Sequence, residues 1–76
     1  MTDPTVSEIE ALQAEIADFQ AQLEQTAKSI RDLRDAEDVA KGVFHAEAIH
    51  AAQQDRLRLE FEIQYRKARI TRLRFG

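Results

Sequence analysis

Apolar and small residues recur at alternating spacings of three and four along residues 9–44, and this pattern constrains the fold most. Such spacing places the side chains in one stripe along a helix. A stripe sustained for about five heptads is typical of a coiled coil and has to be covered by another helix. Its positions are Ile9, Leu12, Ile16, Phe19, Leu23, Thr26, Ile30, Leu33, Glu37, Ala40 and Phe44.

A second stripe with the same spacing follows over residues 49–73. When the two stripes are set antiparallel in the register that matches most apolar positions, the midpoint falls at residue 41, beside Gly42. A glycine suits a left-handed cap at the end of a helix, so the chain is expected to reverse there. The second stripe consists of Ile49, Ala52, Arg56, Leu59, Ile63, Arg66, Ile70 and Leu73.

We therefore predict an all-α fold, an antiparallel two-helix coiled-coil hairpin forming a single domain over residues 1–76. Its first helix should span about residues 4–41, its turn about 42–43 and its second helix about 44–74. Asp3 and Pro4 are suited to the first helix start, as cap and first helical residue. In this register Arg66 faces Ile16, and we expect Glu15 and Glu62 to pair with Arg66 and Arg69.

The chain of 76 residues has no cysteine, so neither a disulfide nor a thiolate-bound metal can stabilise it. So short a chain also buries only a small core. Elongated pairing and oligomerisation are the remaining ways to bury apolar surface. We therefore expect hairpins to associate into a four-helix bundle or a larger helical oligomer. No apolar run is long enough to cross a membrane. The N-terminus also lacks the basic stretch followed by an apolar stretch that is typical of a secretory signal peptide, so we expect a soluble, cytoplasmic protein.

The second predicted helix carries another apolar stripe, roughly opposite to the first on a helical projection. A two-helix hairpin cannot cover both faces of one helix, so this stripe predicts an interface with another copy or another protein. Scattered exposed apolar residues are the plainer alternative. The predicted interface comprises Val43, Leu57, Phe61, Tyr65, Ala68 and Phe75.

Charge is distributed unevenly along the chain, although the net charge is only −3. Residues 1–24 contain six acids and no base, whereas residues 56–76 contain seven bases and two acids. Helix electrostatics and attraction between the two ends explain this pattern. The alternative is contact with nucleic acid, in which bases contact phosphates and aromatic rings stack on nucleobases. The candidate residues for partner or nucleic-acid contact are Arg58, Arg69, Arg72 and Arg74.

The sequence contains few candidates for a catalytic or metal-binding motif. Glu47-x-x-His50 has the spacing found in di-iron helical bundles, but a surface pair at this spacing is a simpler interpretation. The chain contains no catalytic triad pattern, phosphate-binding glycine loop or cysteine nucleophile. We expect no enzyme activity and no cofactor. The sequence favours an oligomerising assembly or adaptor subunit, with a small nucleic-acid-handling subunit as the alternative.

Overall fold

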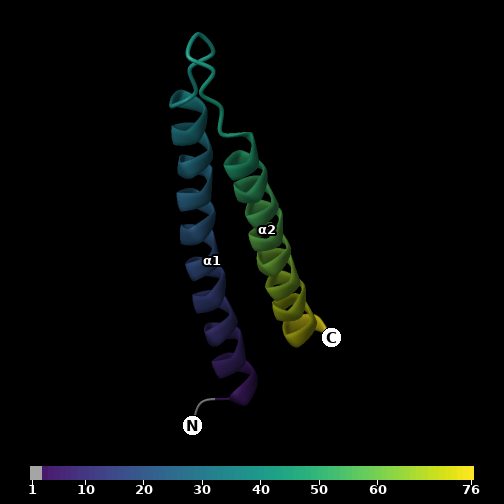
Figure 1. Ribbon diagram of the computed structural model, residues 1–76. Helices are drawn as coiled ribbons and strands as arrows, with labels where there is room; N and C mark the ends of the chain where they lie inside the picture. The colour runs from purple at the N-terminus through teal and green to yellow at the C-terminus, as the bar shows by residue number, and fades with distance from the viewer. Residues whose placement is uncertain (1–2) are drawn as a thin grey trace.

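The computed structural model describes residues 3–76, which form two long antiparallel helices, α1 (Pro4–Asp35) and α2 (Ala46–Phe75). Figure 1 shows the helices side by side, with the start of α1 and the end of α2 toward one end of the rod and residues 36–45 at the other. The molecule measures 64 × 20 × 12 Å. The predicted all-α helical hairpin is therefore confirmed.

The start of α1 follows from two residues. The Asp3 carboxylate accepts a hydrogen bond from the backbone N–H of Thr5 at 2.9 Å, which satisfies one of the free donors in the first turn. Pro4 occupies the first helical position, where its missing N–H costs nothing. Both predicted roles are confirmed.

The core is a narrow seam between the two helices. Leu12, Ile16, Ile63 and Ile70 form one buried cluster, and Leu59 is fully buried. Burying one such aliphatic side chain is worth about 1.5–3 kcal/mol. The half-buried residues Ile9, Phe19, Leu23 and Leu73 pack against the cluster, so its eight members all come from the two predicted stripes.

Arg66 is the polar member of this seam. Its guanidinium lies 4.5 Å from the centroid of the Phe19 ring, and its side chain remains 18% exposed. It donates hydrogen bonds of 2.8 Å to Glu15 on α1 and to Glu62 one turn earlier on α2. These bonds raise the pKa of Arg66 above its ordinary value, chiefly through Glu62 and then Glu15. The predicted pairing of Arg66 is confirmed.

Arg69 differs from the expectation. It hydrogen-bonds Glu8 at 2.7 Å rather than Glu15 or Glu62. Both acids expected to pair with Arg69 are already engaged by Arg66, and Glu8 lies two turns closer to the start of α1. The Glu8 bond also raises the pKa of Arg69.

The connection between the helices corrects the predicted boundaries of both. Helix α1 ends at Asp35 rather than near residue 41, and α2 begins at Ala46 rather than at 44. The intervening backbone forms a tight turn in which Asp38 and Val43 exchange two hydrogen bonds, of 2.8 and 2.9 Å. The Asp38 carboxylate also accepts from the Lys41 N–H, the kind of local bond by which aspartate competes with helix.

Gly42 therefore has a role other than the predicted helix cap. Its φ is +67°, and its N–H donates to the Val39 carbonyl, which closes the turn. The cap of α1 is Ala36, whose N–H donates to the Asp32 carbonyl. The final stripe positions lie beyond α1, so the seam stops at Leu33 and Phe44 is exposed.

We predict that Ile63→Val lowers the free energy of unfolding by about 0.5–1.5 kcal/mol, because it removes one methylene from the close-packed seam. Chemical denaturation monitored by circular dichroism measures the change. Val39→Ala, which shortens an exposed residue in the connection, is the control and should shift stability by less than about 0.5 kcal/mol. Equal effects of the two substitutions would contradict the assigned core.

We also predict that Gly42→Ala costs about 1 kcal/mol, because a Cβ disfavours the positive φ at this position. A Cβ built at Gly42 meets no atom within 4 Å, so the cost arises from the backbone alone. Gly42→Asn should cost less, since asparagine tolerates the left-handed region better than alanine. A stability series of the two variants by thermal melting tests this order.

Candidate functional site

One face of α2 is left uncovered by α1. We call it the outer face and define it by Leu57, Phe61, Tyr65, Ala68 and Phe75. All five residues are exposed, including Phe61 at 67% and Phe75 at 84%. They follow one another at helical spacing, whereas the buried residues of α2 belong to the seam. The exposure of these five predicted site residues makes the outer face available for a contact.

Aromatic residues are concentrated outside the core. The chain has four Phe and one Tyr, and only Phe19 packs against the seam. Phe44, Phe61, Tyr65 and Phe75 are all exposed. Large rings contribute strongly to cores and interfaces when they are buried, and four of the five rings of this chain are exposed.

Val43 does not belong to the outer face as predicted. It precedes α2 and lies in the turn, where its backbone pairs with Asp38. The helical phase used to place it therefore does not apply. Val39, Val43 and Phe44 instead form a second group of exposed apolar residues in the connection, which the sequence pattern had assigned partly to the helices.

The predicted basic contact residues separate into two kinds. Arg58 is held by Asp55 at 2.8 Å, and Arg69 is held by Glu8 at 2.7 Å. Arg72 and Arg74 lie in the last turn of α2 and make no ion pair with any residue from 3 to 76. Among the bases of α2, this second pair and Lys67 make no ion pair with a described residue and so offer charge that the hairpin itself does not use.

Glu47 and His50 lie in the first turns of α2, where both are exposed. Over the described part of the chain, no three His, Asp or Glu side chains gather in a way that could hold a metal ion. Glu47 does lie in the first turn of α2, where an acid interacts favourably with the helix dipole.

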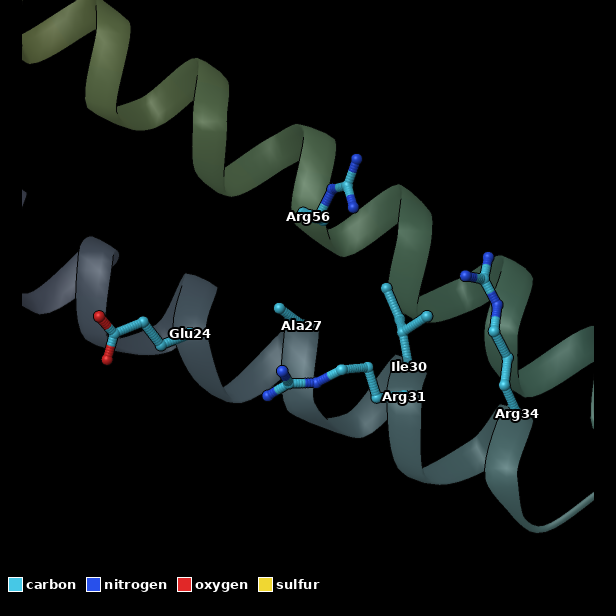
Figure 2. Close-up of a pocket in the computed structure, with 6 residues that line it drawn as sticks. All are labelled: Glu24, Ala27, Ile30, Arg31, Arg34 and Arg56. Carbon is cyan, nitrogen blue, oxygen red and sulfur yellow. The ribbon is translucent and has the colours of Figure 1, made fainter.

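A shallow hollow of about 420 Å³ lies between the helices, beside the last turns of α1 (Figure 2). Arg31 and Arg34 of α1 and Arg56 of α2 line it, around the apolar side chain of Ile30. Arg56 is 3.6 Å from Glu60, and the close-up shows the three guanidinium groups pointing in different directions. Sequence reasoning missed Arg31 and Arg34, although their spacing of three places them one turn apart on a helix.

No helix among residues 3–76 combines the length and the apolar character that a bilayer-spanning segment requires.

Comparison with known proteins supplies no family for this chain. It matches no protein-family model, no curated protein and no solved structure. The functional inference therefore depends on the surface of the hairpin, and above all on the outer face of α2.

Proposed function

We propose that the protein is a non-enzymatic assembly subunit whose helical hairpins associate with one another through the outer face of α2. The observation that carries this proposal is the exposure of Leu57, Phe61, Tyr65 and Phe75 on the helix face that α1 leaves open. Apolar patches of this kind on soluble proteins mark interaction sites. A second copy is always available at the same concentration, and isologous pairing of one patch with itself is the commonest mode of association.

The surface of the hairpin supports the same proposal. It exposes 5773 Å², whereas a compact monomer of this mass exposes roughly 4,700 Å² by the usual scaling. Within the described chain only six apolar residues are buried: Leu12, Ile16, Ile30, Leu59, Ile63 and Ile70. A fold with so small a core and so large a surface gains stability from association.

The composition of the outer face fits a protein interface. Aromatic residues and arginine are enriched in interface cores, and here Phe61 and Tyr65 are bordered by Arg58 and Arg72. Arg58 is already positioned by Asp55, which lowers the entropy lost when it is ordered in a contact. These features favour a homo-oligomeric assembly or adaptor role.

Nucleic-acid binding is the second candidate function, favoured by Lys67, Arg72 and Arg74 beside exposed aromatic rings. It ranks second because Arg56, Arg58, Arg66 and Arg69 are each paired with an acid of the same chain. Paired bases release fewer counterions from a phosphate backbone and contribute less to binding. A net charge of −3 also opposes such a role.

The proposal predicts that Phe61→Glu lowers the solution mass to that of one chain while the protein stays helical. A charge at this position opposes burial of the outer face but does not touch the seam. Light scattering measures the mass and circular dichroism the helix content. An unchanged mass for Phe61→Glu would contradict self-association through this face.

The matched control is Leu59→Glu, two residues earlier on the same helix. Leu59 is 0% exposed in the seam, so an unpaired carboxylate there should unfold the hairpin itself. Loss of helix in Leu59→Glu, together with retained helix in Phe61→Glu, distinguishes the two faces of α2.

For the alternative function, a salt titration of DNA and RNA binding is the test. Binding that involves Arg72 and Arg74 should weaken steeply as salt rises, with a smaller slope in an Arg72→Gln, Arg74→Gln variant. We expect no such binding by the native protein at physiological salt. Tight, salt-sensitive binding reduced by this double variant would place the nucleic-acid role first.

A further inference from the structure

The charge pattern of α2 indicates how two outer faces meet. Residues 46–62 carry four acids and two bases, whereas residues 63–75 carry five bases and no acid. If two copies of α2 ran parallel, their basic halves would lie side by side and repel each other. If they run antiparallel, each basic half lies against the acidic half of the other copy, and the helix dipoles also oppose each other favourably.

We infer that two hairpins pair through antiparallel α2 helices whose outer faces cross near residues 62 and 63. This inference rests on the proposed self-association and adds its direction and register. It places Phe61 beside Tyr65 of the second copy and Leu57 against the small side chain of Ala68 of the second copy. A large side chain facing a small one allows the helices to approach closely.

The charged residues that flank the outer face favour this register over the one displaced by a heptad. At the crossing near residues 62 and 63, Glu60 lies opposite Lys67 of the second copy on both sides of the two-fold axis. Arg58 then borders Tyr65 of the second copy, where its guanidinium can stack on the ring. Displacing the pair by one heptad brings Glu60 opposite Glu60 and Arg58 opposite Arg58, which places like charges together.

The residues required for these edge contacts are accessible on one hairpin. Glu60, Lys67 and Arg58 are all exposed, and Lys67 makes no ion pair with any described residue. Glu60 is 3.6 Å from Arg56, a contact exposed to solvent on both sides and therefore weak. The pairing consequently recruits charges without breaking the ion pairs that Arg66 and Arg69 make with α1.

Cysteine cross-linking tests the direction of pairing, because the chain has no cysteine of its own. Gln54 and Thr71 are exposed polar residues of α2, and the proposed register places each opposite the other across the two copies. A Gln54→Cys protein mixed with a Thr71→Cys protein should form a covalent dimer under mild oxidation. Each protein alone should form none, since its own cysteines lie far apart in the antiparallel pair.

The possible outcomes are distinct. Covalent dimers from either protein alone would overturn the antiparallel arrangement in favour of a parallel one. A dimeric mass without any cross-link would also overturn it, and would mean that the outer face contacts another part of the second copy, such as α1. A monomeric mass for the native protein would refute the proposed function itself, so the two failures are distinguishable.

Charge reversal supplies a second readout that leaves the apolar contact intact. Lys67→Glu should weaken the dimer roughly fivefold in Kd, because Glu60 then meets a like charge on both sides of the two-fold axis. Reversing both residues, Glu60→Lys with Lys67→Glu, should restore the native affinity. In a parallel pair Lys67 would lie near Arg72 of the second copy, so a tighter Lys67→Glu dimer would overturn the inference.

Discussion

The close contact of aliphatic side chains between α1 and α2 is the interaction on which the rest of the structure depends. Each helix contributes three buried residues, and every large outward-facing residue of α2 is placed by the requirement that Leu59, Ile63 and Ile70 face α1. A helix has a fixed angular spacing, so burying one stripe determines where the other points. The exposed outer face is therefore a direct geometric consequence of the seam.

Ion pairs within the hairpin then determine which of the charged side chains outside the seam are already engaged. Arg66 and Arg69 bind acids of α1 across the interface and help to hold the helices in register, so they are part of the hairpin rather than of its surface chemistry. The bases of α2 that remain unpaired among the described residues, Lys67, Arg72 and Arg74, lie in its C-terminal part. This division explains why a helix that is rich in arginine along its sequence presents less free positive charge than its composition indicates.

The sequence predicted the hairpin and its pairing because both follow from a regular apolar period that repeats over many turns. It did not predict that α1 ends at Asp35, since the stripe continues formally through Glu37 and Ala40. The decisive contacts there, between Asp38 and Val43, are turn interactions without a period. Acids at residues 35, 37 and 38 oppose the dipole at a helix C-terminus, and this was the available signal for an earlier end.

The candidate site shows the same division. The helical period predicted that Leu57, Phe61, Tyr65, Ala68 and Phe75 share one face of α2, and they are exposed there. The same period misplaced Val43, which lies outside the helix. Composition does not show which arginines lack an ion pair. The pairing of Arg69 with Glu8, for example, depends on how the two side chains lie across the helix interface. The helical period of α2 likewise specifies an exposed apolar face but does not specify which chain would cover it.

The self-contained turn at residues 38–43 has a consequence for how the chain folds. Its backbone bonds join residues only a few positions apart, so the reversal of direction costs little loop-closure entropy. Once the turn has formed, it holds the end of α1 near the start of α2, and each following pair of seam residues is brought together by the pair before it. The hairpin can therefore close progressively from its tip toward its two ends, so no pairing of distant segments has to nucleate on its own.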